Sequence, residues 1–305
     1  MNITAKDVQS LRQKTGVGMM ECKKALVEAN GNEEEAIKIL RERGIAVAAK
    51  KSTRIAAEGV VDIMYCSECN RAAIIEVNTE SDFAAKNEKF SSFVKELLEV
   101  ILKKNPANVE ELLAADFDGS MNVEEAVKNK IFTVGENINI RRFEIVDGPV
   151  STYVHGKGTI GVIVKMSAAS DDAKFAEAAK NVALQVASMN PAYLDKDSVP
   201  ASVVDAEKEV IAAQIQNDEA NAKKPAAVIE KMVAGKINKF FNSNCLMLQE
   251  YVKEDNMSVA KYLEGVSKEI GCEVKPVAFV RFEKGEGLEK KNENFAEEIA
   301  KLTNK

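Results

Sequence analysis

An internal repeat constrains the fold of this chain more than any other feature of its sequence. Seven apolar residues between Phe90 and Leu102 recur at the spacing of one helix face. Phe175 stands 85 positions after Phe90, and the residues at the same offset from the other six, up to Ala187, are again all apolar. Both stretches are followed by Asn-Pro, at 105–106 and 190–191. We therefore predict two related units, each built on a long amphipathic helix.

Each helix of the repeat is accompanied by segments typical of β-strands. Two apolar runs precede it and a third follows further along the chain, at 59–65, 72–77 and 139–146 in the first copy and at 151–155, 159–166 and 274–282 in the second. Short strands of this kind form antiparallel sheets that helices cover on one face. The expected fold class is α+β, with two small antiparallel sheets and their helices.

Residues 1–44 indicate three short helices, at about 5–14, 19–29 and 33–43. Thr4 and Asp7 form a capping-box pattern at the start of the first, and Gly44 is expected to end the third. A bundle of this size is barely large enough to fold alone, and it is more typical of a binding module than of a catalytic one. Residues 45–58 are expected to form a linker.

The second copy is expected to contain an inserted helical hairpin and to be followed by one more helix. Residues 203–217 and 226–241 have helical patterns, and Pro225 suits the first turn of the second of them. Residues 292–302 are amphipathic, which is typical of a helix docked on its own domain or on a partner. The expected organisation is a three-helix domain with its linker (1–54), a first subdomain (55–148), a second subdomain (149–198 and 244–284), the hairpin (199–243) and a C-terminal helical module (285–305).

The charge and composition argue against several function classes. The net charge is -6, with 46% hydrophobic and 30% charged residues, which is typical of a globular protein without a chain-wide nucleic-acid surface. There is no membrane-length apolar run and no signal core, so a cytoplasmic location is expected. His155 is the only histidine, and no catalytic, P-loop or dinucleotide pattern accompanies it. We therefore expect no enzyme, no cofactor and no metal, and we interpret "HGKGTIG" (155–161) as a hairpin turn.

Five cysteines are spread along the chain, and two of them are close together. An odd, sparse set suits a reducing compartment. Cys66 and Cys69 have the spacing of zinc ligands, but no second Cys/His pair completes a site with four ligands. Because the pair falls between two predicted strands, a plain turn is favoured. A metal site and a redox-active pair stay open, although a thioredoxin-like pair would need a strand, a turn and a helix around it.

The stretch "NTESDFAAKN" (78–87) joins a predicted strand to the first helix of the repeat and allows two interpretations. In the first, Thr79 and Asp82 form a capping box, and Phe83, seven positions before the apolar stripe, begins the core of the helix. In the second, Phe83 is an exposed binding residue. The second copy favours exposure, because its corresponding connection, around Ser167, contains no Asp-Phe pair.

Seven motifs follow one another along the chain. They are "LRQKTGVGMMECKKALVEANGNEEEAIKILRERG" (11–44), "EVNTESDFAAKN" (76–87), "GENINIRRF" (135–143), "YVHGKGTIGVIV" (153–164), "MNPAYL" (189–194), "KPAAVIEKMVAGKINKFF" (224–241) and "RFEKGEGLEKK" (281–291). Across essentially its whole length the chain resembles the bacterial elongation factor Ts family, the guanine-nucleotide exchange factors for elongation factor Tu. The first motif resembles the ubiquitin-associated-like domain of that family.

The resemblance implies a mechanism and a set of site residues. In the family, an Asp-Phe pair pushes between two helices of the GTPase near its magnesium site, so that the ion and then GDP are lost. By position this role falls on Ser81, Asp82, Phe83 and Ala84. The family signature has Thr at the first of these positions and Val at the last. The resemblance implies further contacts with elongation factor Tu for Arg12, Met19, Met20 and His155.

The resemblance also bears on self-association and on rival functions. The hairpin resembles the coiled-coil, dimerisation-associated element of the family, which leaves a homodimer or a 2:2 complex open. No direct nucleic-acid or membrane contact is expected. A ubiquitin-binding adaptor would fit the three-helix domain alone, but it would not explain the repeat or the Asp-Phe pair. Met19 and Met20 suit an adaptable apolar contact, but the core of the bundle would accommodate them equally well.

Overall fold

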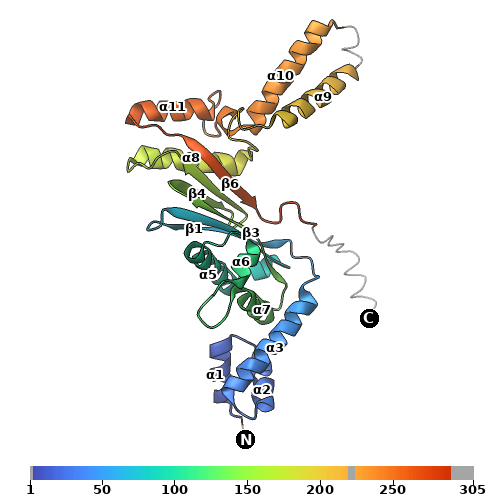
Figure 1. Ribbon diagram of the computed structural model, residues 1–305, viewed down its shortest axis with the longest axis vertical. Coiled ribbons are helices and arrows are strands. Elements are labelled where there is room, and N and C mark those ends of the chain that lie inside the picture. Colours follow the sequence, from blue (N-terminus) through green and yellow to red (C-terminus); the bar gives the residue numbers. More distant parts are fainter. Residues whose placement is uncertain (1–2, 219–223, 290–305) are drawn as a thin grey trace.

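The computed structural model describes residues 3–218 and 224–289, and the N-terminal part of this range forms a three-helix bundle (Figure 1). Thr4 and Asp7 form the predicted capping box, and Gly16 ends the first helix in the left-handed conformation, with φ 68°. The bundle consists of α1 (Ala5–Thr15), α2 (Met19–Glu28) and α3 (Glu33–Lys51).

The third helix continues beyond Gly44, which the sequence had indicated as its end. Gly44 is buried against α7 (Val123–Val134), where a β-carbon on Gly44 would already touch Phe132. Contact between α3 and α7 therefore stabilises the helix through a residue of low helix propensity. The predicted linker at 45–58 is correspondingly reduced to residues 52–57.

The first copy of the repeat forms a three-stranded antiparallel sheet in the order β1-β2-β3. Its strands are β1 (Glu58–Cys66), β2 (Arg71–Thr79) and β3 (Ile138–Asp147). The predicted stripe lies on α5 (Glu88–Lys104), which crosses one face of the sheet and fully buries Phe90 and Leu97. Two helices that the sequence patterns did not identify complete this unit, α6 (Val109–Ala114) and α7.

The second copy repeats this arrangement in the order β4-β5-β6. Its strands are β4 (Val150–His155), β5 (Ile160–Met166) and β6 (Pro276–Glu283). The second predicted stripe, from Phe175 to Ala187, is buried on α8 (Ala173–Met189). Beside it packs α11 (Val259–Ile270), which was not predicted. All six predicted strands and both repeat helices are thus confirmed.

The two sheets pack face to face, so that each is covered by helices on its outer face only (Figure 1). Val61 and Ile74 belong to the apolar layer between them. Gly161 permits the close approach, because a β-carbon on it would lie 2.5 Å from Cγ1 of Val61. The turn at 156–159 is also attached to the first sheet, since Val61 N donates to Gly158 O at 2.8 Å. The body therefore has four layers: helices, sheet, sheet and helices.

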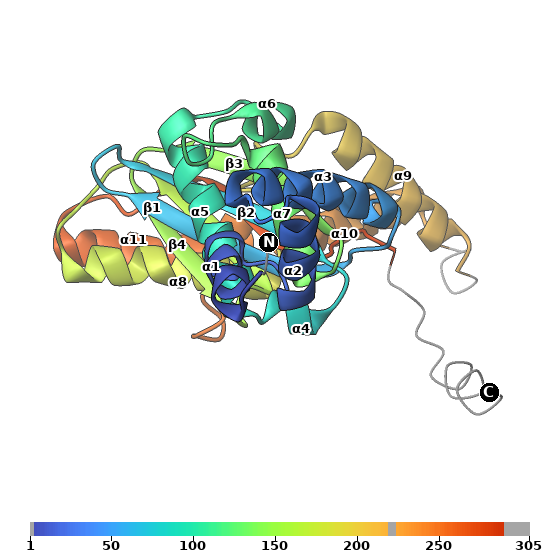
Figure 2. The ribbon, with the colours of Figure 1, turned by 90° about the horizontal axis from the view of Figure 1, so that it is seen from below.

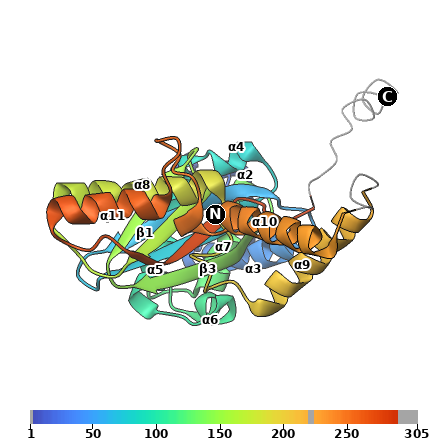
Figure 3. The ribbon, with the colours of Figure 1, turned by 90° about the horizontal axis from the view of Figure 1, so that it is seen from above.

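An antiparallel hairpin of two helices projects from the second copy (Figures 1 and 3). It consists of α9 (Ala201–Gln216) and α10 (Ala226–Asn244), as predicted, with Pro225 directly before the second helix. A small core of isoleucines around Ile215 holds the two helices together. The chain then returns to the second sheet through a 3-10 turn, η2 (Leu246–Leu248).

The predicted C-terminal helix at 292–302 lies outside the described residues. Within residues 3–218 and 224–289, no helix combines the length and the apolar character that crossing a membrane requires. The domain boundaries given above remain predictions.

Candidate functional site

The Asp-Phe pair lies on a helix of a single turn, α4 (Asp82–Ala85), between β2 and α5. We refer to residues 81–85 as the Asp-Phe turn. Since α5 starts separately, with its own cap at Asn87, Phe83 does not continue the apolar stripe of that helix. Phe83 is 82% exposed, more than any other large hydrophobic residue that the structure describes. The core interpretation of Phe83 is therefore excluded.

The carboxylate of Glu136 holds the Asp-Phe turn in place. It accepts hydrogen bonds from Ser81 N at 2.9 Å, from Ser81 Oγ at 2.6 Å and from Thr79 Oγ1 at 3.0 Å. Ser81 Oγ in turn caps α4 by accepting a hydrogen bond from Ala84 N at 3.2 Å. The predicted capping box of Thr79 with Asp82 is therefore wrong, because the Thr79 hydroxyl is bonded to Glu136 and Ser81 is the cap.

A second carboxylate, on the residue before the turn, accepts a hydrogen bond from the segment that contains Glu136. Glu80 Oε1 accepts a hydrogen bond from Asn137 N at 2.7 Å, and Arg54 forms an ion pair with Glu80 at 3.4 Å. Hydrogen bonds to a charged group are roughly twice as strong as those between neutral groups. The motif "GENINIRRF" contained Glu136 and Asn137, but its sequence carried no signal that they face the Asp-Phe turn. The bonds between Glu136 and Ser81 and between Asn137 and Glu80 together fix the conformation of the turn in the free chain.

Asp82 stands beside Phe83 with its carboxylate partly in solvent. Lys86 Nζ donates a hydrogen bond to it at 2.5 Å. This hydrogen bond is the main cause that holds the pKa of Asp82 below its ordinary value, and the charge of Lys86 adds to it. Asp82 is therefore ionised at neutral pH. The turn presents an aromatic ring and a negative charge side by side, whereas Ala84, the last predicted site residue, is buried beneath it.

Phe83 borders a groove of about 950 Å³ between the three-helix bundle and the first copy. The loop between α1 and α2 lines one side of this groove, and α5 and α7 line the other. Seen along the long axis of the molecule, α4 lies beside α1 and α2 (Figure 2). The structure thus brings the bundle and the Asp-Phe turn to a shared concave surface.

Comparison with known proteins identifies the family. A family model described as "Elongation factor TS" matches residues 80–286. A protein of Clostridium perfringens (strain ATCC 13124) named elongation factor Ts is 44% identical over 306 residues, which cover 99% of this chain and 100% of that protein. A protein of the same name from Clostridium botulinum (strain 657) is 45% identical over 307 residues, which cover 99% of each chain. The chain belongs to the elongation factor Ts family.

Membership of the elongation factor Ts family confirms the resemblance seen in the sequence and places the chain in translation elongation. Nucleotide exchange on elongation factor Tu is the role that this membership supports. Exchange of a bound nucleotide makes and breaks no covalent bond, so this role depends on binding surfaces.

In this member of the elongation factor Ts family, the three contact residues expected in the bundle lie on its surface. Arg12 is exposed, and Met19 and Met20 are 40% and 67% exposed, so neither methionine belongs to the core. Met20 and Val27 border a separate depression of about 430 Å³ on the surface of α2. None of the three expected residues lines the groove beside Phe83. The bundle therefore has a depression of its own, in which two apolar side chains lie among four charged ones.

His155 ends β4, and the hairpin turn predicted within 155–161 is confirmed at 156–159. Its ring is exposed, and its Nδ1 lies 2.8 Å from Tyr153 OH. His155 does not line the groove, so the structure does not bring it together with Phe83.

Three of the sequence motifs meet at a buried carboxylate that the sequence did not indicate. Glu76 is fully buried and accepts hydrogen bonds from Arg142 Nε at 2.7 Å, from Arg141 at 3.0 Å and from Gly285 N at 2.8 Å. Burial by itself would raise the pKa of Glu76, but the hydrogen bonds from Gly285 and the two arginines outweigh it and leave this pKa below its ordinary value. The cluster joins β2, β3 and the segment after β6 close to the strand end that carries the Asp-Phe turn.

Proposed function

We propose that the chain is a guanine-nucleotide exchange factor that binds elongation factor Tu in its GDP form and inserts Asp82 and Phe83 beside the magnesium site. Magnesium and GDP are displaced, and the nucleotide-free partner is held until GTP binds. The observation that carries this proposal is the placement of Phe83, an aromatic ring 82% exposed on a turn that Glu136 fixes. Such a ring loses its unfavourable contact with water only when a partner covers it.

The expected free energy is of the right size for this role. Full burial of a Phe side chain is worth about 1.5–3 kcal/mol, and each 1.4 kcal/mol is a factor of ten, so the ring alone would weaken nucleotide binding roughly 10- to 100-fold. Because Glu136 already fixes the turn, little of this free energy is lost in ordering it. By linkage, nucleotide weakens the factor's hold on its partner by the same amount, which allows GTP to release the factor.

We refer to the inserted pair, Asp82 and Phe83, as the wedge. Asp82 adds a negative charge to it. Its carboxylate is ionised at neutral pH, and its ion pair with Lys86 is exposed, so the pair is easily exchanged for a contact with a partner. Beside a nucleotide whose magnesium ion has left, a negative charge would repel the phosphates. Asp82 would thus act on the nucleotide, and Phe83 on the helices around it.

The remaining residues would supply affinity. Arg12, Met19 and Met20 are exposed, and the two methionines suit an adaptable apolar contact with the GTPase domain. His155 would form a further contact on the nucleotide side of the partner. Ser81 and Ala84 support the wedge, because Ser81 caps α4 and Ala84 is packed beneath it.

Release of labelled GDP from elongation factor Tu tests the proposal. We expect Phe83→Ala to slow stimulated release roughly 10- to 100-fold, and Asp82→Ala to slow it less. The double variant should slow release by less than the two single effects combined, because the pair acts as one unit. Tyr65→Ala removes another exposed aromatic ring outside the groove. It is the control, and it should stimulate GDP release from elongation factor Tu as well as the natural chain does. Undiminished release with folded Phe83→Ala would refute the wedge.

A further inference from the structure

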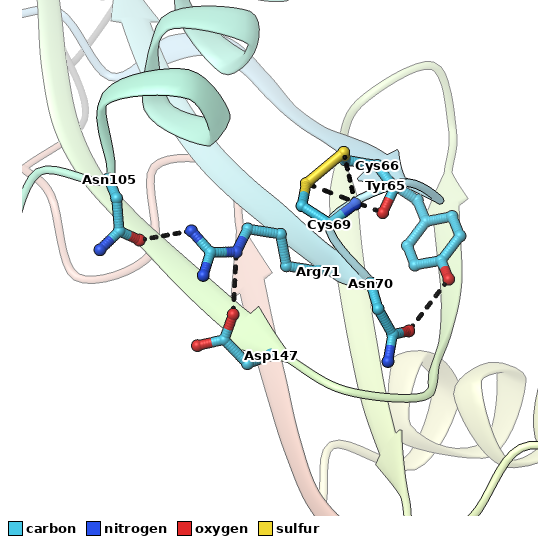
Figure 4. Close-up of a disulfide and its surroundings, with 7 residues drawn as sticks. All are labelled: Tyr65, Cys66, Cys69, Asn70, Arg71, Asn105 and Asp147. Atoms are coloured by element: carbon cyan, nitrogen blue, oxygen red, sulfur yellow. Dashed lines mark hydrogen bonds and ion pairs between the residues drawn. A yellow bond between two sulfur atoms is a disulfide. The ribbon is translucent and has the colours of Figure 1, made fainter.

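A disulfide joins two cysteines at the tip of the first hairpin, a place that the proposed function does not use (Figure 4). Cys66 ends β1 and Cys69 lies in the turn before β2, with their Cα atoms 5.6 Å apart. Strands lie on both sides of the pair, so it lacks the helix that follows the cysteines of a thioredoxin-like oxidoreductase. The pair therefore does not have the surroundings of a thioredoxin-like oxidoreductase.

The two sulfur atoms are not equivalent. Cys69 is exposed, whereas Cys66 is half-buried. The amide of Cys69 donates a hydrogen bond to Sγ of Cys66 at 3.3 Å. A donor directed at a sulfur atom stabilises its thiolate, which makes that sulfur the better leaving group. An incoming thiolate would therefore reach Cys69 and expel Cys66.

The hairpin tip is attached to the connection between the two sheets (Figure 4). Asn70 adopts the left-handed conformation, with φ 46°, and its carbonyl oxygen accepts a hydrogen bond from Gly148 N at 2.8 Å. Arg71 forms an ion pair with Asp147 at 2.9 Å and donates to Asn105 at the end of α5, also at 2.9 Å. Because Asp147 and Gly148 lead from β3 to β4, these contacts attach the tip to the junction between the two copies.

We propose that Cys66–Cys69 is a reversible thiol–disulfide exchange site for a dithiol reductant, and that its redox state controls the attachment of the hairpin tip to residues 147–148. One thiolate of the reductant attacks Sγ of Cys69, forms a mixed disulfide and releases Cys66 as a thiolate. The second thiolate attacks the reductant's own sulfur in that mixed disulfide and releases Cys69. The reductant gives up two electrons and two protons and becomes a disulfide, and the two cysteines receive them as thiols.

The surroundings of the pair distinguish it from a structural cross-link and from a metal site. Disulfides in reducing compartments are usually transient, and an exposed one is readily attacked. Cys22 and Cys245 are buried and Cys272 is half-buried and unpaired in the described part of the chain, so only this pair can exchange internally there. In the same part, no group of three or more His, Cys, Asp or Glu could hold a metal ion, so a zinc site lacks ligands.

Differential alkylation of the full chain tests the exchange, after equilibration with mixtures of reduced and oxidised dithiothreitol. Cys66 and Cys69 should become reactive together, in one two-electron transition, while the buried Cys22 and Cys245 stay protected. Cys272→Ser is the matched control and should leave the transition unchanged, whereas Cys66→Ser should abolish it. A pair that stays oxidised in excess reduced dithiothreitol, or stays reduced in excess oxidised dithiothreitol, overturns the proposal.

Amide hydrogen exchange tests the coupling to the junction. Reduction should speed exchange of the Gly148 amide several-fold, because the turn that positions its acceptor, Asn70, is no longer cross-linked. Amides of β5 serve as the internal reference and should not change. A variant with both Cys66→Ser and Cys69→Ser should exchange rapidly at Gly148 with and without reductant. Equal exchange at Gly148 in the two redox states of the natural chain would show that the coupling is absent.

Discussion

The two strand-to-helix connections of the repeat differ in a way that separates the needs of the fold from those of function. In the first copy, residues 80–87 contain α4 and the exposed Phe83, whereas residues 167–172 of the second contain no helix. Yet the following helices begin alike, capped by Asn87 and Asp172 with φ -72° and -69°. A cap of this kind is sufficient to start either helix, so the Asp-Phe turn is an addition that the fold does not require.

The two connections are also attached differently to the third strand of their sheets. In the second copy, Ser167 N donates to the backbone carbonyl of Lys275, directly before β6, at 2.9 Å. In the first copy, Ser81 N donates at the same distance, 2.9 Å, to the side chain of Glu136, shortly before β3. A carboxylate reaches further than a backbone carbonyl and accepts several hydrogen bonds at once. This exchange of acceptor leaves room for the additional turn.

Replacement of three phenylalanines tests whether the Asp-Phe turn is separate from the fold. The expected changes in the free energy of unfolding are the largest of those predicted here. Phe90 and Phe175 are buried at matching places in the two copies, and replacement of either by Ala should lower the free energy of unfolding by about 3–5 kcal/mol. Phe83→Ala should change it by less than about 0.5 kcal/mol, as is usual for an exposed position. Denaturant unfolding measures all three. If Phe83→Ala destabilised the protein as much as Phe90→Ala does, the turn would be part of the core.

Glu136→Gln tests the attachment of the turn. The amide keeps the size of the side chain but loses its charge and one acceptor oxygen, so the bonds to Ser81 and Thr79 cannot all persist. The attachment should weaken by about 1.5–3 kcal/mol, the usual worth of hydrogen bonds to a charged group, with faster amide exchange at Ser81 and slower GDP release.

Glu111→Gln is the control for this variant, because Glu111 also accepts a hydrogen bond from a backbone amide but lies outside the groove. Faster amide exchange at Ser81 together with undiminished GDP release would mean that the wedge works without being fixed. Slower release from both variants would point to a general effect of lost surface charge.

The buried polar groups of the two copies predict a pH effect that belongs to the first copy. The first copy encloses the carboxylate of Glu76. The second copy encloses the amides of Gln185 and Gln249, which do not titrate. The pKa of Glu76 is lower in the folded chain than in the unfolded chain. Its contribution to stability is therefore fully present above the unfolded pKa and is lost as the pH falls through the folded pKa.

Unfolding of the natural chain and of Glu76→Gln across a pH series measures this contribution. The difference in unfolding free energy should be largest above about pH 5 and should shrink toward lower pH. Gln185→Asn is the counterpart in the second copy, and its effect should not depend on pH over this range. A difference for Glu76→Gln that stayed constant down to strong acid would show that the pKa of this carboxyl is the same in the folded and the unfolded chain.

The hairpin belongs to the second copy alone, and its removal should have the smallest effect on exchange. Because α9 and α10 enclose a core of their own, replacing residues 203–241 by a short linker should leave both sheets folded. Self-association should change, as measured by light scattering, while GDP release stays close to that of the natural chain. An unchanged molecular mass would argue against a role in dimerisation, and a lost cooperative melt would show that the hairpin supports the second core.

The sequence was a good guide to the repeated elements and a poor guide to contacts between distant segments. Helical periodicity located α5 and α8 because each stripe faces one core. Gly44 looked like a helix end because propensity is local, whereas the contact with Phe132 that carries α3 past it is not. The spacing of Thr79 and Asp82 favours a local cap, because the actual partner of Thr79, Glu136, lies far along the chain. The exposure of Phe83 could not be decided from spacing alone, since the same spacing fits a single continuous helix.

The unbroken path of α3 through Gly44 has a mechanical consequence. A helix of 19 residues is about 28 Å long, and its middle packs against α7. The distance between the surface of the bundle and the Asp-Phe turn is therefore fixed. A partner that touches both would have to adjust its own shape to that spacing.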